Sequence, residues 1–277
     1  MTDEDRRPTS GDRPPIVELR DVTAGYRSRP VLDRISLAIA PAERVAVLGP
    51  NGAGKSSLLR VMSGILKPSR GTALLAGDPI DRLDRGTVAR RLAVVPQASM
   101  LPFATRVEEL VGLGRIPHED PFRGHRPADR AAIAAAIDRV GVGHLLGRDA
   151  RELSLGERQL VLIALAVAQA APLILLDEPT VHLDIRHQVQ VMDLLVDLNE
   201  RDGTTVVAVV HDLRFAAHFF GRTVVVDRAR IVADDVPDRA LEPERVREVF
   251  GVDPGLVRLG LPVAADSLRI YRATRVD

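Results

Sequence analysis

The sequence predicts an α/β fold built around a parallel sheet. Two short apolar segments, LILLD at 173–177 and TTVVAVV at 204–210, are bounded by polar residues. Such segments are typical of strands that are buried on both faces of a parallel sheet. Between them, apolar residues recur near helical spacing and Gly203 provides a stop signal. A strand, a helix and a second strand in this order indicate a right-handed crossover unit.

The remaining elements are predicted in chain order. Candidate strands are Ile16–Val22, Arg44–Leu48, Thr72–Leu75 and Leu92–Val95. The segment from about 99 to 169 lacks long apolar strands and is rich in helical patterns, which predicts a mostly helical insertion. In the crossover helix, the expected apolar face consists of Val189, Met192, Leu195, Val196 and Leu198. After about Asp227, EPERVREVF is expected to be helical and the rest to form short strands.

The composition limits the class of protein. The 277 residues are 45% hydrophobic, with 38 basic and 38 acidic side chains and no cysteine. This length allows one large domain with an insertion, and the balanced charge gives no support to a nucleic-acid partner. No apolar stretch approaches the roughly 20 residues that a membrane-spanning helix needs. Residues 1–14 are polar and proline-rich, so we expect a disordered tail on a soluble, cytoplasmic chain.

A glycine-rich segment predicts a nucleotide phosphate site. GPNGAGKS at 49–56 fits the template G-x-x-x-x-G-K-[ST] at every fixed position, between an apolar strand and a helical pattern. The glycines let backbone N–H groups face anionic oxygens, Lys55 can reach the β- and γ-phosphates, and the Ser56 hydroxyl can bind Mg²⁺. Taken alone, this loop leaves kinases, GTPases and motor ATPases open. The expected nucleotide contacts are Gly49, Pro50, Asn51, Gly52, Ala53, Gly54, Lys55, Ser56 and Ser57.

Two carboxylates end one of the buried strands. Asp177 and Glu178 directly follow the apolar residues of LILL. Asp177 is suited to hold Mg²⁺, and Glu178 to polarise the water that attacks the γ-phosphate, because hydrolysis needs both charge compensation and an oriented water. Together with the phosphate loop, the pair predicts a nucleotide hydrolase.

At this point the sequence resembles the ATPase subunits of ABC transporters. LSLGERQ at 153–159 is similar to that family's signature, and Gln97, VHLD at 181–184 and His211 follow the order of its other motifs. The resemblance covers about residues 16 to 253. It implies a P-loop NTPase core with a mixed, largely parallel sheet, an N-terminal antiparallel β subdomain and an inserted helical subdomain. The implied ATPase domain spans 15–260, and 261–277 form a C-terminal extension.

The resemblance also implies roles for single residues. Catalysis would involve Glu178, His211 and Gln97, and Mg²⁺ would be held by Ser56, Gln97 and Asp177. Tyr26 would stack on the adenine of ATP. Further ATP contacts would come from the signature helix and the segment after the acidic strand, namely Ser154, Gly156, Glu157 and Asp184. In the family the signature faces the nucleotide of the opposite subunit, so a complete site would require a second copy of the chain.

Three leucines depart from the family pattern. Leu155 replaces the usual first glycine of the signature pair, and Leu160 and Leu165 stand where relatives commonly carry arginines. A leucine restricts the backbone more than glycine does. We therefore expect weaker ATP-driven closure of two chains, with family membership unaffected.

The segments 101–110 and LGRIPH at 113–118 resemble the subgroup that serves importers of iron–siderophore complexes, haem and cobalamin. The implied partners are transmembrane permease subunits and, indirectly, a substrate-binding protein, with the chain lying peripherally on the cytoplasmic face of the membrane. Leu101, Pro102 and Phe103 are expected to contact the permease. The alternatives are an ATPase of another importer or an exporter, and a non-transport ABC ATPase. The single ATPase domain, the absence of sustained heptads and the neutral charge argue against the last of these.

Overall fold

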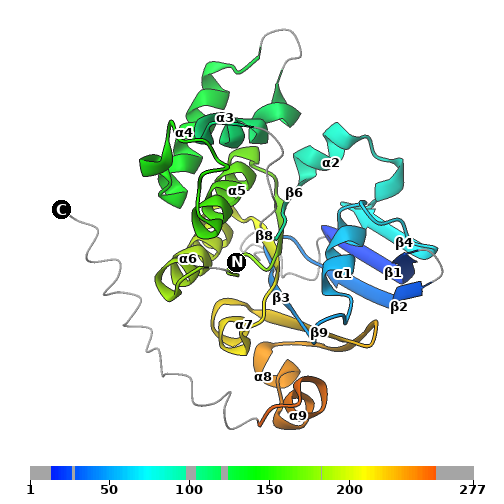
Figure 1. The fold of residues 1–277 in the computed structure, drawn as a ribbon. Coiled ribbons are helices and arrows are strands. Elements are labelled where there is room, and N and C mark those ends of the chain that lie inside the picture. Colours follow the sequence, from blue (N-terminus) through cyan, green and yellow to red (C-terminus); the bar gives the residue numbers. More distant parts are fainter. Residues whose placement is uncertain (1–13, 27–28, 98–103, 120–123, 182, 254–277) are drawn as a thin grey trace, which may run out of the picture.

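Two β-sheets and a group of helices make up the chain in the computed structural model, which describes residues 14–26, 29–97, 104–119, 124–181 and 183–253 (Figure 1). The first sheet is antiparallel, with strand order β2-β1-β4-β5. Its strands are β1 (Val17–Tyr26), β2 (Arg29–Ile39), β4 (Arg70–Leu75) and β5 (Asp78–Pro79).

The second sheet has the order β10-β9-β3-β8-β7-β6. All neighbours in it are parallel except β9 and β10. The strands are β3 (Arg44–Leu48), β6 (Leu92–Val95), β7 (Leu173–Asp177), β8 (Thr205–Val209), β9 (Arg222–Asp227) and β10 (Arg230–Asp235). Because five parallel strands share one direction, their carboxyl ends lie at the same edge of the sheet.

The two faces of this second sheet belong to different hydrophobic cores. In β3, Val45 and Val47 enter the core shared with the antiparallel sheet, whereas Ala46 and Leu48 enter the core on the other face. This alternation follows from the two-residue period of a strand. Helix α1 (Lys55–Met62) contributes to the first core and contacts strands of both sheets. The nucleotide loop that precedes α1 is thereby held between the sheets.

The second core is covered by helices. They include α5 (Leu155–Gln169), α6 (Ile185–Asp202) and α7 (Leu213–Phe219), together with α3 (Val107–Gly112) and α4 (Pro127–Val140) of the helical region (Figure 1). Short elements complete the described chain: η1 (Ile80–Arg82), α2 (Arg85–Arg91), η2 (Leu113–His118), η3 (Gly143–Leu145), α8 (Pro237–Ala240) and α9 (Pro243–Phe250). Within the described residues, no helix combines the length and apolar character needed to cross a membrane.

The LGRIPH segment forms η2 and caps the end of α5. Arg115 Nη1 donates to the carbonyl of Ala168 at 2.8 Å, and His118 Nε2 lies 2.8 Å from the carbonyl of Gln169. Arg115 also pairs with the buried carboxylate of Asp129 on α4 at 3.1 Å. Carbonyls at the end of a helix lack intrahelical partners, so these two side chains satisfy them, and Arg115 joins η2, α4 and α5.

The predicted fold class is confirmed, including the mixed sheet, the antiparallel β subdomain and the helical insertion. Some details were wrong. β1 extends to Tyr26, and β2 and β9 were not predicted. On α6 the buried face uses Val191 and Leu194, whereas Val189 and Val196 are only partly buried.

Several expectations lie outside the described residues. They concern the tail (1–13), the contacts of Leu101, Pro102 and Phe103, and the extension at 261–277. The proposed boundaries of the domain and of the insertion remain predictions.

Candidate active site

The functional side chains follow the carboxyl ends of four neighbouring parallel strands. The phosphate loop (residues 49–56) follows β3, Gln97 follows β6, Asp177 and Glu178 end β7, and His211 follows β8. Ligands of open α/β sheets bind at this edge. The strand order thus brings together residues that lie more than 100 positions apart in the sequence.

Two glycines of the phosphate loop are required by close packing. Gly49 has φ 151° and Gly54 has φ 110°. A Cβ on Gly49 would lie 2.0 Å from the Val226 carbonyl oxygen of β9, and one on Gly54 would lie 2.5 Å from the Val31 carbonyl oxygen of β2. The loop therefore takes its shape between the two sheets, and N–H groups of the first turn of α1 have no intrahelical partners and can bind phosphate.

Hydrogen bonds to the backbone position the ammonium group of Lys55 at this loop. Its Nζ donates to the carbonyls of Gly49 at 2.9 Å and Pro50 at 3.0 Å, and only 6% of the residue is exposed. Burial lowers the pKa of Lys55, while the carboxylates of Glu178 and Asp177 oppose that shift. A phosphate in the loop would give the ammonium a stronger, charged acceptor than these two carbonyls.

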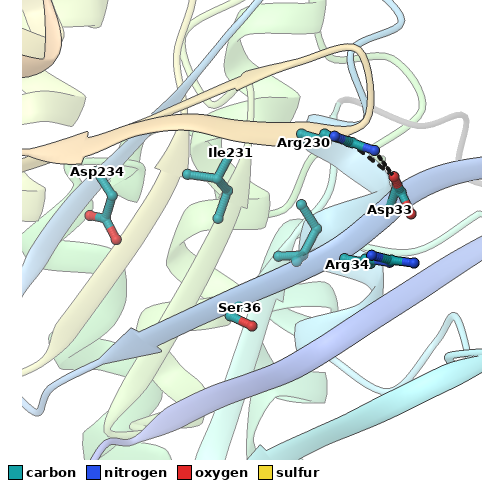
Figure 2. Close-up of a pocket in the computed structure, with 7 residues that line it drawn as sticks. Asp33, Arg34, Ser36, Arg230, Ile231 and Asp234 are labelled. Carbon is teal, nitrogen blue, oxygen red and sulfur yellow. Dashed lines mark hydrogen bonds and ion pairs between the residues drawn. The ribbon is translucent and has the colours of Figure 1, made fainter.

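The turn between β9 and β10 contacts the phosphate loop and stabilises its conformation. Arg228 and Ala229 adopt φ of 45° and 66°, as tight hairpin turns require. Ala229 N donates to the Ala53 carbonyl at 3.3 Å, and its own carbonyl accepts from Asp33 N of β2 at 2.8 Å. Beside this turn, Arg230 pairs with Asp33 at 2.6 Å across a shallow groove between β2 and β10 (Figure 2). None of the residues lining that groove belongs to the phosphate loop, so we do not place the chemistry there.

Ser56 and Asp177 form an oxygen pair that fits Mg²⁺. Ser56 Oγ donates to Asp177 Oδ1 at 3.0 Å. Burial raises the pKa of Asp177, partly offset by the Ser56 hydroxyl, so its charge is costly without a compensating cation. Hard oxygen donors from one carboxylate and one hydroxyl beside a phosphate site are the ligands that Mg²⁺ uses in nucleotide hydrolases.

Glu178 lies between two polar side chains. Its Oε2 accepts from Gln97 Nε2 at 2.9 Å, and its Oε1 lies 2.5 Å from His211 Nε2. The backbone of Glu178 is in the left-handed region, at φ 53°, and its N–H donates to the Val209 carbonyl at 3.2 Å. Such a conformation is unfavourable for a residue with a side chain and is often found at functional sites. The carboxylate is thus oriented to accept a proton beside the phosphate loop.

Other predicted residues are not brought to this cluster. Ser154 and Glu157 satisfy each other in a capping box at the start of α5, with distances of 2.8 and 3.2 Å, and Glu157 also accepts from Arg148. Asp184 caps α6 through the His187 N–H at 2.9 Å. Tyr26 is 45% exposed, and its hydroxyl accepts from Arg60 of α1 at 2.6 Å.

The three leucines that depart from the family pattern have different environments. Leu155 is 47% exposed at the first position of α5, and Gly156 follows it. Leu160 is 5% exposed within the second core, and Leu165 is partly buried against it. The side chain of Leu160 packs inside the core, and the weaker ATP-driven closure expected from the three leucines remains a prediction.

Comparison with known proteins agrees with this geometry. The model of the ABC transporter family matches residues 32–181, more than half of the chain. The hemin import ATP-binding protein of Pseudomonas fluorescens is 42% identical over 228 residues, covering 80% of this chain and 88% of that protein. The cobalamin import ATP-binding protein of Halobacterium salinarum is 41% identical over 230 residues, covering 81% of this chain. The present chain spans only 57% of the length of that second relative.

A solved structure has the same fold. A dimeric ATP-binding cassette in a post-hydrolysis state, bound to ADP and phosphate, superposes with a TM-score of 0.71 at 28% identity, covering 80% of this chain and 98% of that one. The relatives are ATP-binding proteins of importers, as the sequence resemblance implied. The present chain therefore belongs to the ABC transporter family of ATP-binding proteins.

Proposed function

We propose that this chain binds and hydrolyses ATP to power an ABC importer for an iron–siderophore complex, haem or cobalamin. The observation that carries the proposal is the position of Glu178 between Gln97 and His211, next to the Ser56–Asp177 pair and Lys55. The cargo classes come from the names of the relatives, which include hemin, cobalamin and ferric enterobactin import proteins.

Binding would begin at the phosphate loop. Backbone N–H groups of residues 52–57 and the start of α1 attract the phosphates, and Lys55 exchanges the Gly49 and Pro50 carbonyls for phosphate oxygens. Mg²⁺ held by Ser56 and Asp177 would supply charge compensation for the β- and γ-phosphates. Tyr26 is exposed and adjacent to Arg60 of α1, so its ring is available to stack on the adenine.

Hydrolysis would use the side chains of Glu178, Gln97 and His211. The carboxylate accepts a proton from the attacking water, and Gln97 and His211 fix the direction in which it points. In the described structure, these two side chains contact Glu178 directly. A water entering between them would replace one of these contacts and be oriented at once.

A second copy of the chain would complete the site. Ser154, Gly156 and Glu157 stand at the N-terminus of α5. The side chains of Ser154 and Glu157 each accept from the other's backbone N–H, and Glu157 also accepts from Arg148. A helix N-terminus favours anionic ligands, so these residues are suited to the nucleotide of a partner chain. Analytical ultracentrifugation with and without MgATP tests this, and a strictly monomeric chain under both conditions would count against it.

The membrane partners are proposed from the same family membership. Permease subunits would hold the chain at the cytoplasmic face of the membrane, and a substrate-binding protein would act on it indirectly. The docking role of Leu101, Pro102 and Phe103 remains a prediction. Uptake into vesicles that carry the assembled transporter, measured with haem, cobalamin and ferric siderophores in turn, would identify the cargo.

The decisive test of the hydrolytic role is Glu178→Gln. We expect ATP binding to persist and turnover to fall by roughly 10²- to 10⁴-fold, the usual effect of removing a positioned base. Glu248→Gln makes the same change on the exposed face of α9 and serves as the control. Near-normal turnover of Glu178→Gln would remove Glu178 from the mechanism.

A further inference from the structure

Two glutamine side chains attach helix α5 to strand β6, one near each end of the strand. Gln169 Nε2 donates to the carbonyl of Leu92, the first residue of β6, at 2.9 Å, and to that of Ala89. Gln159 Nε2 contacts the carbonyl of Pro96, directly after the last residue of β6, at 3.5 Å. Since α5 belongs to the helical region and β6 to the central sheet, these contacts join the two parts of the molecule.

The contact at Gln159 is incompletely satisfied. The residue is 1% exposed, its contact with the Pro96 carbonyl is longer than an ordinary N–H···O hydrogen bond, and its Oε1 has no partner in the described part of the chain. Buried amide oxygens are nearly always hydrogen-bonded, and an unpaired one destabilises the fold. An apolar side chain of the same size would suit this position better, so stability alone does not account for glutamine here.

Pro96 connects the side-chain amide of Gln159 to the candidate active site. Pro96 is bonded covalently to Gln97, whose Nε2 donates to Glu178 at 2.9 Å. Gln159 lies little more than one turn along α5 from the capping box of Ser154 and Glu157. A displacement of α5 is therefore transmitted through one amide to the backbone that carries Gln97.

We propose that Gln159 is a positioning residue for hydrolysis: its buried amide ties the backbone of Pro96 to α5 and so sets whether Gln97 reaches Glu178. This inference rests on the proposed ATPase function and deepens it. The long bond and the unpaired Oε1 leave the contact easily shortened or lost, which suits a joint that changes when a partner chain or a nucleotide moves α5. Gln169, with two shorter bonds, is the fixed end of the attachment.

The test is Gln159→Met, which keeps the length of the side chain and removes both polar atoms. We expect kcat for ATP to fall roughly 10- to 100-fold, the range for a catalytic group moved by about 1 Å, while KM for ATP stays within about twofold. The melting temperature should be unchanged or higher, because no buried amide remains unpaired. Gln190→Met is the matched control, because Gln190 also donates from a partly buried amide to a carbonyl, that of Val140 at 3.0 Å. Its kcat should remain normal.

A double substitution shows whether Gln159 acts through Gln97. Gln97→Ala combined with Gln159→Met should be no slower than Gln97→Ala alone, because the second change has nothing left to position. Multiplying effects would overturn the proposal, as would normal kcat in Gln159→Met. A lowered kcat accompanied by a lower melting temperature and a raised KM would also overturn it, because that pattern indicates general disruption of the fold.

The outcomes separate this inference from the proposed function. If Glu178→Gln is inactive and Gln159→Met is normal, only the positioning role fails. If Glu178→Gln is fully active, the catalytic role of Glu178 fails, and the proposed function itself fails only if the parent chain does not hydrolyse ATP. Should Gln159→Met not fold, Gln159→Leu, with a shorter apolar side chain, supports the same comparison of kcat with KM.

Discussion

The phosphate loop should not tolerate even one added methyl group at Gly49. In Gly49→Ala, the new Cβ would lie 2.0 Å from the Val226 carbonyl oxygen, whereas real Cβ contacts are essentially never shorter than 3.0 Å. The neighbour is backbone of β9, which is paired on both sides by β10 and β3, and it cannot rotate away, so the loop must move by about 1 Å. A displacement of that size can reduce catalysis about 10²-fold, and we expect a loss of this order in kcat/KM for ATP.

The matched control is Gly77→Ala, in the turn between β4 and β5. Gly77 also has positive φ, at 86°, but a Cβ there would meet nothing within 4 Å. It therefore carries only the cost of a left-handed backbone, about 1–2 kcal/mol, which lowers the melting temperature by a few degrees. Calorimetric titration with ATP, steady-state turnover and a melting curve should be measured on both variants. If Gly49→Ala binds and hydrolyses ATP as well as Gly77→Ala does, the argument from Val226 is refuted.

The remaining predictions concern stability. Leu160→Ala should lower the free energy of unfolding in urea by about 2–5 kcal/mol, because the side chain is buried in the second core. Leu155→Ala, at an exposed position, should lower it far less, and equal losses would contradict the described packing. Burial raises the pKa of Asp177, so the folded chain retains this proton to higher pH than the unfolded chain and loses stability as pH rises through that window. Nucleotide-free Asp177→Asn should accordingly unfold at higher urea than the parent at pH 7, with a difference that shrinks as the pH falls; a constant difference would show that ionisation is not the cause. Ser154→Ala removes the side-chain cap of α5 and should lower stability by about 1 kcal/mol, as judged by thermal melting; an unchanged melting temperature would show that the cap does not stabilise the chain.

The central sheet could be predicted because its strands are nearly continuous apolar segments. LILLD and RVAVL coincide with β7 and β3, since a strand buried on both faces has no polar position to obscure it. β2 could not be recognised in this way. Its buried residues Leu32 and Ile35 break the two-residue period, because Arg34 between them adopts a positive φ of 51°. β9 was not predicted, although its segment TVVVD has the same apolar pattern as β7 and could have been predicted from it.

The candidate site was predictable where its chemistry is local. Lys55, Ser56, Asp177 and Glu178 belong to contiguous motifs, and the structure places Ser56 against Asp177. The contact of Gln97 and His211 with Glu178 depends on the order β8-β7-β6, which follows from tertiary pairing. The sequence suggested Gln97 as a metal ligand as well, and the described contact is with Glu178. Gln97 and His211 were predicted from the resemblance to a family. The spacing of apolar residues along the chain does not identify them.

The support of the phosphate loop was invisible in the sequence for another reason. Val226 and Ala229 act through a backbone carbonyl and a backbone N–H, and every residue except proline offers both. No side-chain pattern therefore marks them. Only the pairing of β9 beside β3 identifies their role.

That pairing has a consequence for how the protein is made. The phosphate loop at 49–56 leaves the ribosome long before the strand and hairpin that hold it, which lie at 222–235. During synthesis the loop must therefore lack these contacts until β9 and β10 have been translated. Contacts of such long sequence separation also slow folding. Nascent chains that stop before Ala229 should be unable to retain ATP, and the ability to bind nucleotide should arise late and abruptly as translation proceeds.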